Sequence, residues 1–364
     1  MLKEALKLGM QKLWTLQRED LRQKHQLTYL FWECTLNCNF FCAHCGSRAG
    51  RKTHTDELST EEIKKVFSDV AHAYNAKKIT IAVTGGEPLM RKDLFEVMGY
   101  ASQLGFPWGM VTNGFLVTED KVRQMKEAGM KSIDVSIDGI GETHDTLRAV
   151  PGAYDHAIEA LRLLLKAGFI KIVRVSTSVS QKNIHEIETL YEKFQSMGLK
   201  YWRLLSVDPI GRAMDSDDLI LNTEQMTWLL RFIKKTRKEG KMDVTFGCSM
   251  FLGAEFEDEV RSYFFNCGTG INIGTVLHNG DIFVCPNVPR VPELIQGNAR
   301  RDPFPEVWEN KFKFFRDRNR TACDQCQKCE HWNECLGGSM HLWDFDQKKP
   351  KRCYAREICG PLRK

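Results

Sequence analysis

Residues 31–48 read FWECTLNCNFFCAHCGSR, and in this stretch Cys38, Cys42 and Cys45 have the spacing Cys-x3-Cys-x2-Cys. Three thiolates on one short loop can each bind one iron of a [4Fe-4S] cubane and leave the fourth iron without a protein ligand. That open iron can chelate an amino acid through its amine and carboxylate. Zinc is the alternative, but structural zinc usually has four protein ligands, and His44 is adjacent to Cys45 and would be strained in a shared tetrahedron. Cys34 is interpreted as a buried thiol.

On the carboxyl side of this stretch, strand-like and helix-like segments alternate as far as residue 240. Short apolar or β-branched segments predict strands at 27–34, 78–83, 107–112, 131–137, 170–178 and 200–206. Amphipathic segments predict a helix after each strand, at 59–74, 92–104, 118–128, 154–167, 183–197 and 223–238. Six β-α units predict an α/β fold with a parallel sheet and right-handed crossovers. Because eight units close a full barrel, six predict an open, partial (β/α)6 barrel.

Short polar or glycine-containing motifs follow the first four predicted strands. They are the cysteine loop 38–45, then residues 85–88, then Asn113-Gly114, then Asp138-Gly139. Ligands of such folds bind at the carboxyl ends of the strands, so these motifs are expected to form one shared site.

The stretch 31–48 resembles the cluster loop of the radical SAM superfamily, and the resemblance extends over nearly the whole chain. It implies that Cys38, Cys42 and Cys45 hold the catalytic [4Fe-4S] cluster and that S-adenosylmethionine (SAM) binds the open iron. Residues 84–88, TGGEP, are similar to a family segment whose backbone and Glu87 would receive the SAM amino group. The small glycines there allow a close backbone approach.

The same resemblance implies the remaining SAM contacts. Ser136 would contact the ribose or the carboxylate, and Arg148 would pair with the carboxylate through a charge-assisted contact. Residues 209–213, PIGRA, would lie near the adenosine. The full set of implied cofactor-binding residues is Gly85, Gly86, Glu87, Pro88, Asn113, Ser136, Asp138 and Arg148.

A second group of cysteines lies after residue 245 among glycines, prolines and charged residues. Cys267, Gly280 and Cys285 resemble the opening of a SPASM domain, and Cys326, Cys329, Cys335 and Cys353 resemble its centre and end. The resemblance implies a second [4Fe-4S] cluster on those last four thiolates, with zinc as the alternative, because four cysteines also suit tetrahedral zinc. We therefore expect a loop-rich domain that is stabilised by metal.

This region departs from the SPASM pattern at Ser339, where the family usually has a cysteine ligand of another auxiliary cluster. Cys267 and Cys285 would then need a partner. Cys323 is the preferred candidate, giving three thiolates and an open iron or an oxygen ligand, and Cys248 and Cys359 are further candidates. The alternative is that this cluster is absent or altered. Pro286 and Asn287 follow Cys285 where sulfatase-maturing relatives place an aspartate base, which argues against formylglycine formation.

The composition restricts where the protein acts and what it binds. The 364 residues include thirteen cysteines, and the formal net charge of +5 counts every thiol as neutral. The N-terminal segment lacks the apolar core of a signal peptide, and close cysteine spacings in a reducing cytoplasm indicate metal binding. No apolar stretch is long enough for a membrane span, and no basic patch with stacking aromatics suggests nucleic acid.

Three domains are expected along the chain. Residues 1–26 form an amphipathic helix, with leucines at 2, 6, 13 and 16, that packs on the body or else meets a membrane surface or a partner. Residues 27–240 form the radical SAM core, and residues 241–364 form the SPASM-type domain.

The resemblance implies an oxidoreductase that generates a 5′-deoxyadenosyl radical and abstracts hydrogen from its substrate. SPASM relatives most often modify a peptide or protein side chain, which makes that substrate class the first hypothesis. A small-molecule pathway, for example that of a tetrapyrrole, is the second, supported by the haem-branch likeness of residues 32–45. An external one-electron reductant of the flavodoxin or ferredoxin type is expected. The competing class is a non-catalytic iron–sulfur or zinc protein.

Overall fold

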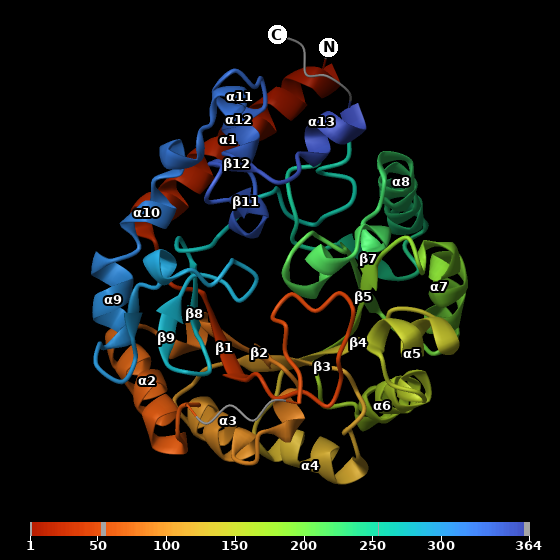
Figure 1. Ribbon diagram of the computed structural model, residues 1–364, viewed down its shortest axis with the longest axis vertical. Helices are drawn as coiled ribbons and strands as arrows, with labels where there is room; N and C mark the ends of the chain where they lie inside the picture. The colour runs from red at the N-terminus through yellow and green to blue at the C-terminus, as the bar shows by residue number, and fades with distance from the viewer. Residues whose placement is uncertain (1, 52–55, 254, 360–364) are drawn as a thin grey trace.

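A curved sheet of ten strands runs through the computed structural model, which describes residues 2–51, 56–253 and 255–359 (Figure 1). Six consecutive strands form its centre, and each pairs in parallel with the next. They are β1 (Tyr29–Thr35), β2 (Thr80–Gly85), β3 (Trp108–Thr112), β4 (Ser132–Ser136), β5 (Ile172–Val179) and β6 (Tyr201–Ser206). The α/β fold with a partial barrel is confirmed.

The helices that follow these strands cover the outer, convex side of the sheet (Figure 1). They are α2 (Thr60–Ala73), α3 (Leu94–Gln103), α4 (Glu119–Glu127), α6 (Ala153–Ala167), α7 (Ile187–Ser196) and α8 (Thr223–Glu239). Ser59 caps α2 in a capping box with Glu62, which satisfies backbone donors at both residues. The core between sheet and helices is built on large side chains such as Trp32, Trp108 and Trp202, all fully buried.

The sheet continues past the expected domain boundary at residue 240. Strand β7 (Asp243–Phe246) extends it beside β6, and β8 (Ile273–Val276) pairs in parallel with β1 at the opposite side. Strands β9 (Asp281–Phe283) and β10 (Gly297–Asn298) complete that edge. The domain limits remain a prediction, and the cysteine-rich region shares the sheet of the barrel.

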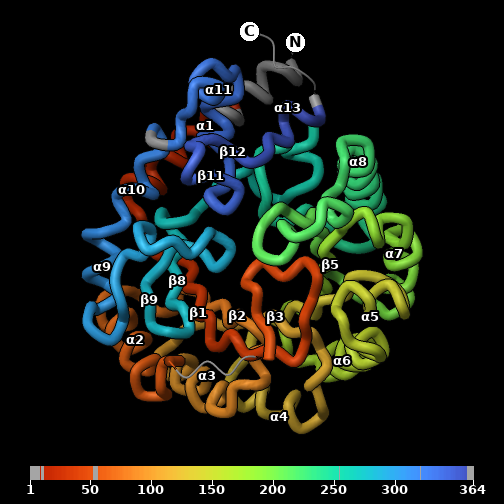
Figure 2. Tube along the Cα trace, in the orientation of Figure 1, coloured from red at the N-terminus to blue at the C-terminus, as the bar shows by residue number. Residues whose placement is uncertain are grey.

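The rest of the C-terminal region is loop-rich, as its sequence indicates. It contains the short elements α9 (Phe304–Asn310), α10 (Lys313–Arg316), α11 (Asp324–Gln327), α12 (Trp332–Cys335), β11 (Trp343–Asp344), β12 (Lys349–Pro350) and α13 (Tyr354–Cys359). The chain trace shows this region beside the barrel, along the upper left and top of the view (Figure 2).

The N-terminal helix α1 (Leu2–Lys24) packs on the cysteine-rich region, but not through Leu13 or Leu16. Leu13 and Leu16 are 69% and 68% exposed. The contacts come from Trp14, whose ring lies 5.2 Å from that of Phe264, and from Arg18, whose Nη1 donates to the carbonyl of Glu334 at 2.9 Å. The helix turns its Trp14–Arg18 side inward because a guanidinium can satisfy carbonyls at the end of α12. The side chains at positions 2 and 6 lie outside the described residues.

In the segments 2–51, 56–253 and 255–359, no helix combines the length and the apolar character that a membrane crossing requires.

Candidate functional site

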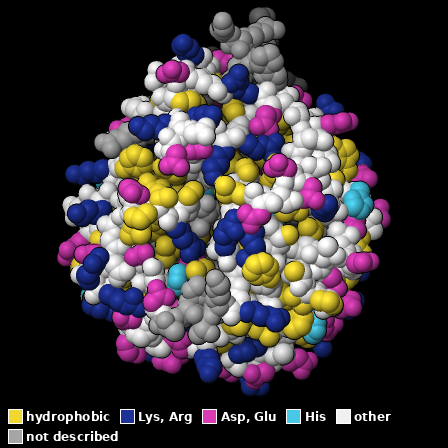
Figure 3. Space-filling view, viewed as in Figure 1, with side chains coloured by type: hydrophobic (Ala, Val, Ile, Leu, Met, Phe, Trp, Pro, Cys, Tyr) yellow, Lys and Arg dark blue, Asp and Glu magenta, His cyan; other side chains and the backbone are white. Residues whose placement is uncertain are grey.

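A cavity of about 150 Å³ lies at the carboxyl ends of the first strands and is lined by Cys38, Cys42 and Cys45. It opens on the same face as the central hollow of the molecular surface, which hydrophobic and basic side chains border (Figure 3). Of the eight residues implied to bind the cofactor, the cavity wall contains Gly85, Gly86, Glu87, Asn113, Ser136 and Arg148. The structure therefore brings the three cysteines and most of the implied SAM residues together.

Gly85 and Gly86 fix the distance between the turn after β2 and the cysteine loop. A Cβ at Gly85 would stand 2.1 Å from the carbonyl oxygen of Thr35, and one at Gly86 would stand 2.1 Å from that of Asn37. Gly85 also has φ +133°, which L side chains rarely adopt. The backbone amides of residues 86 and 87 donate to those two carbonyls at 2.7 and 2.9 Å. The glycines thus let two backbones meet at the cavity.

Glu87 joins this turn to the end of β3. Its carboxylate accepts hydrogen bonds from Thr112 Oγ1 at 2.8 Å, from the Asn113 amide at 2.8 Å and from the Leu89 amide at 3.2 Å. Burial raises the pKa of Glu87 despite these donors. Asn113 Nδ2 in turn donates to Asn39 in the cysteine loop at 2.8 Å, so the ends of β2 and β3 hold the loop jointly.

Asp138 and Arg148 form a buried ion pair behind the loop, with Nη2 and Oδ2 2.5 Å apart. Asp138 Oδ2 also lies 3.1 Å from Nε2 of His44, and its Oδ1 accepts from the Ser178 amide at 2.7 Å. Burial alone would raise the pKa of Asp138, but Arg148 and His44 outweigh it and hold that pKa far below its usual value. Asp138 and Pro88 are both absent from the cavity wall, and Asp138 contacts two residues of that wall, Arg148 and His44.

Arg148 connects that pair to the cysteine loop, because its Nη1 lies 3.7 Å from Sγ of Cys42. Burial dominates the shift at the thiols: it raises the pKa of Cys42 and raises the pKa of Cys38 to about 12. Ionised neighbours raise them further, since each thiolate repels the next. These thiols ionise only when a cation or a cluster takes the charge.

The cavity wall also contains residues outside the implied cofactor-binding set. Phe40, His44, Ala49, Val111 and Thr112 line it, and so does Arg212 from the loop after β6. Arg212 donates from Nε to the carbonyl of Cys42 at 2.7 Å and from Nη1 to that of Ala49 at 2.9 Å. The sequence offered a signal for it, because the PIGRA loop was expected to lie near the adenosine.

The second set of cysteines also comes together. Cys326, Cys329, Cys335 and Cys353, the four implied ligands, line one small cavity of about 30 Å³ beside Trp332 and Met250. Burial raises the pKa of each of these thiols, to about 12 for Cys335, and neighbouring thiolates add to the shift at Cys326, Cys335 and Cys353.

Cys323 lies beside the second set of cysteines. Its Sγ is 3.4 Å from that of Cys326, because the two residues are three positions apart at the start of α11 and face the same side. The partner of Cys267 and Cys285 therefore stays a prediction. The side chain of Cys359 lies outside the described residues.

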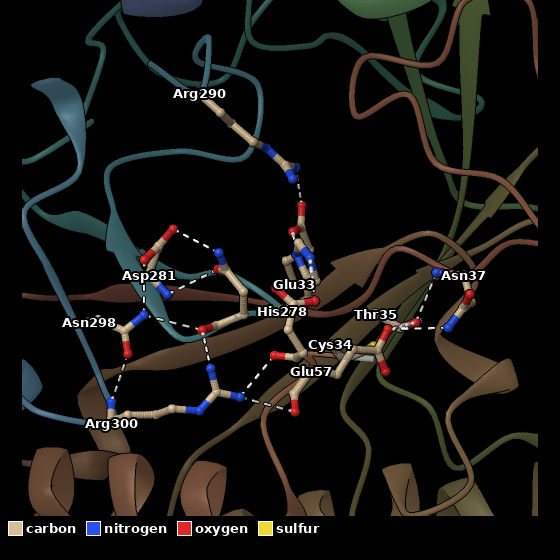
Figure 4. Close-up of polar contacts among 12 residues, drawn as sticks. Glu33, Cys34, Thr35, Asn37, Glu57, His278, Asp281, Arg290, Asn298 and Arg300 are labelled. Carbon is tan, nitrogen blue, oxygen red and sulfur yellow. Dashed lines mark hydrogen bonds and ion pairs between the residues drawn. The ribbon is translucent and has the colours of Figure 1, made fainter. Parts of the chain in front are cut away.

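A buried polar cluster connects the core strand β1 to the region after β8 (Figure 4). Glu33 is fully buried, and its carboxylate lies 2.9 Å from Nδ1 of His278 and accepts from Nη2 of Arg290. Arg300 donates from Nη2 to the carbonyl of Asp56 at 2.8 Å and from Nη1 to that of Asn279 at 2.8 Å. The cluster holds the loops around Cys285 against the strand that leads into the cysteine loop.

The donor set fits an iron–sulfur cluster. Nδ1 of His44 and Nε of Arg148 are buried without a hydrogen-bond partner among the described residues, and both side chains line the cavity, where an anionic group would satisfy them. In the described ranges, no three His, Cys, Asp or Glu side chains converge as ligands of one metal ion do. Each thiolate of a cubane binds a different iron, so a cluster does not need such convergence.

Comparisons with known proteins agree with this geometry. A family model described as the radical SAM superfamily matches residues 32–194, and one described as an iron–sulfur cluster-binding domain, SPASM, matches residues 267–330. An AdoMet-dependent heme synthase of Methanosarcina barkeri is 30% identical over 89% of this chain and 95% of its own length. A mycofactocin maturase of Mycobacterium tuberculosis is 26% identical over 85% of this chain and 78% of its own length.

Solved structures share the fold. Native anSMEcpe with bound AdoMet superimposes with a TM-score of 0.71 at 18% identity, over 91% of this chain and 94% of that one. Streptococcus suis SuiB bound to S-adenosylmethionine gives a TM-score of 0.70 at 16% identity, over 88% of this chain and 75% of that one. The resemblance drawn from residues 31–48 is confirmed, together with its [4Fe-4S] clusters and SAM as cofactors. The chain is an enzyme that belongs to the radical SAM superfamily, in the subgroup that carries a SPASM iron–sulfur domain.

Proposed function

We propose that this enzyme performs its hydrogen abstraction on a tetrapyrrole-type small molecule. The observation that supports this reaction is the cavity lined by Cys38, Cys42 and Cys45 together with Arg148 and the turn at residues 85–86. When bound, the cluster and SAM supply a 5′-deoxyadenosyl radical, which removes a hydrogen atom from a substrate carbon.

The residues of the chain prepare this site. The three cysteines supply the thiolates, and the close contact of Gly85 and Gly86 with the cysteine loop fixes the wall opposite them. Asp138 contacts both His44 and Arg148, and each of these lines the cavity and has one buried nitrogen without a hydrogen-bond partner among the described residues. Rigid support of this kind keeps reacting groups in one geometry and excludes water.

The substrate class rests on similarity. The sequence favoured a peptide or protein side chain first. The heme synthase of M. barkeri supports the small-molecule class at 30% identity over 95% of its length, and so does its Fe-coproporphyrin III synthase at 28% over 83% of its length. The missing aspartate after Cys285 further separates this chain from formylglycine-forming enzymes.

Peptide modification is the second candidate. The mycofactocin maturases support it at 26–27% identity over 77–78% of their length. For either substrate we infer that a one-electron carrier of the flavodoxin or ferredoxin type supplies the electron. A cytoplasmic location suits such a carrier and keeps thirteen cysteines reduced.

The test compares the two classes under identical anaerobic conditions. Reconstituted enzyme with SAM and dithionite receives Fe-coproporphyrin III or a short precursor peptide encoded beside the gene, and both 5′-deoxyadenosine and the substrate mass are followed. The proposal expects Fe-coproporphyrin III to stimulate 5′-deoxyadenosine formation and to change mass. Stimulation by the peptide alone would replace the first candidate with the second.

A further inference from the structure

Two arginines lie on the inner face of the barrel, the concave side of the sheet that the helices do not cover. Trp202 of β6 points outward, where its ring packs against Phe232 of α8. Side chains alternate along a strand, so the next residue, Arg203, points to the inner face. Arg174 of β5 shares that face, because both guanidiniums lie beside one carboxylate, that of Asp134 in β4.

The charges of this group do not balance. Oδ1 of Asp134 lies 3.4 Å from Nη1 of Arg174, and Oδ2 lies 3.2 Å from Nη2 of Arg203. Oδ2 also accepts a hydrogen bond from Ser176 Oγ at 3.1 Å. Each guanidinium has five N–H donors, and among the described residues these two ion pairs are the polar contacts that either arginine side chain makes. One unit of positive charge and most of the N–H donors are therefore available to a further anion.

The inner face is open at this level of the barrel. Strands β3, β5 and β6 each have a neighbouring strand on both sides. The side chains of Arg174 and Arg203 are nevertheless 24% and 34% exposed, and Val111 of β3 is 41% exposed. In a closed barrel the inward side chains fill the interior. Here they leave room, and hydrophobic and basic side chains border the central hollow of the surface (Figure 3).

The strand register connects the two arginines to the cavity of the three cysteines. Two rows of paired residues cross the inner face, Val111–Asp134–Arg174 and Ser136–Ser176–Arg203. Each row begins at a residue that lines the cavity and ends at an arginine. Adjacent strands are about 4.8 Å apart, so the backbone of each arginine is about 10 Å from the cavity wall. A substrate with its reacting carbon in the cavity can therefore place a side chain beside both guanidiniums.

We propose that Arg174 and Arg203 bind a carboxylate of the substrate and so determine which substrate carbon lies in the cavity. Arginine suits this role because its planar fork binds a carboxylate through two parallel hydrogen bonds. Asp134 holds the two guanidiniums side by side. The inference rests on the proposed function: coproporphyrin has an apolar macrocycle, which suits the exposed side chain of Val111, and each of its propionate side chains ends in a carboxylate.

The first test measures the binding of Fe-coproporphyrin III, by its absorption change, to reconstituted full-length enzyme with SAM and without a reductant. Arg174→Gln and Arg203→Gln should each weaken binding about 10- to 100-fold, as expected for the loss of a hydrogen bond between charged groups. Arg162→Gln is the matched control and should bind like the parent, because Arg162 forms an exposed pair with Glu159 on α6. Parental affinity in Arg174→Gln and Arg203→Gln would overturn the inference.

The second test changes the ligand. The tetramethyl ester of Fe-coproporphyrin III keeps the macrocycle but has no carboxylate, so the parent should bind it about 10- to 100-fold more weakly than the acid. Arg203→Gln should bind the ester as tightly as the parent does. If the parent binds ester and acid equally, or if Arg203→Gln weakens the binding of both to the same extent, the arginines do not recognise a carboxylate.

These results separate the inference from the proposed function. A parent enzyme that binds neither compound would exclude the tetrapyrrole substrate, and this inference with it. A parent that converts Fe-coproporphyrin III, while Arg174→Gln and Arg203→Gln bind it with parental affinity, would exclude this inference alone. Iron content and the 5′-deoxyadenosine formed without substrate, measured in each variant, should equal the parental values, since neither arginine contacts the cysteine loop.

Discussion

The guanidinium of Arg148 lies 2.5 Å from the carboxylate of Asp138, and both groups are buried behind the cysteine loop. The pair links the end of β4 to α5 (Glu142–Arg148), and from there to Cys42. The barrel thus supports the cysteine loop in two ways. One is this buried ion pair, and the other is the close contact of the loop with the turn at Gly85 and Gly86.

Removing one member of this pair should destabilise the protein. Asp138→Asn leaves Arg148 buried without its counter-charge, so we expect a loss of about 3–5 kcal/mol in unfolding free energy, measured by anaerobic urea titration. Asp120→Asn is the matched control, because Asp120 forms an exposed pair with Arg123 and should cost less than about 1 kcal/mol. Equal stability of the two variants would show that the buried pair contributes little.

Alanine substitutions at two glycines, Gly85 and Gly99, should have opposite effects. Gly85→Ala would force a Cβ to within 2.1 Å of the Thr35 carbonyl at φ +133°, so we expect little folded protein and little bound iron. Gly99→Ala, in the middle of α3, meets nothing within 4 Å and should stabilise the helix by about 0.5–1 kcal/mol. Soluble yield, iron content and melting temperature measure both. Normal iron in Gly85→Ala would contradict the close contact.

Acid should weaken the site through His144. Burial, followed by the charge of Arg148, lowers the pKa of His144 to about 4, while Nδ1 of the neutral ring accepts from the Asp138 amide. Because the folded pKa lies below the unfolded value, the unfolded chain binds more protons between pH 6.5 and 4, and stability falls as the pH falls through that window.

The measurement is the urea midpoint at several pH values in this window. The parent should lose stability from pH 6.5 downward. His144→Phe, which cannot titrate, should lose less over the same interval although it starts from a lower value. Parallel curves for the two proteins would exclude His144 as the titrating group.

Arg212 should determine how firmly the loop retains its cluster. It donates to the carbonyls of Cys42 and Ala49, and its guanidinium lies 4.0 Å from the ring centroid of Phe41. Two charge-assisted hydrogen bonds contribute about 1.5–3 kcal/mol each, so Arg212→Ala should release iron to a chelator at least about tenfold faster. Arg162→Ala, on the exposed face of α6, should release it at the parental rate. Equal rates would mean that the loop holds the cluster without Arg212.

Much of the barrel could be predicted from the sequence, because each strand is a short apolar run and each helix has a clear periodicity. The strand at 107–112 appears as β3 (Trp108–Thr112), and the helix at 59–74 as α2 with its Ser59 cap. Helix α5 was missed because its seven residues are mostly polar. Strand β8 was missed because four residues carry little pattern, and its pairing with β1 spans more than 240 positions.

The site likewise has residues that the sequence could predict and residues that it could not. Cys38, Cys42 and Cys45 are close in the chain, so their spacing alone indicated a shared cavity. The partner of Cys267 and Cys285 could not be chosen in this way, because the candidates Cys248 and Cys323 lie far from them in the chain and sequence spacing does not say which side chains the fold brings together. Asp138 was expected to touch the cofactor; it lies outside the cavity wall and contacts Arg148 and His44, so that role stays a prediction.

The most direct measurement is the yield of 5′-deoxyadenosine from reconstituted enzyme, SAM and dithionite, with the iron content determined in the same samples. The parent should form 5′-deoxyadenosine, whereas Cys42→Ala should form none while retaining the iron of the auxiliary clusters. If Cys42→Ala forms as much as the parent, or if the parent carries zinc in the loop and forms none, the cavity at Cys38, Cys42 and Cys45 is not the site of radical chemistry.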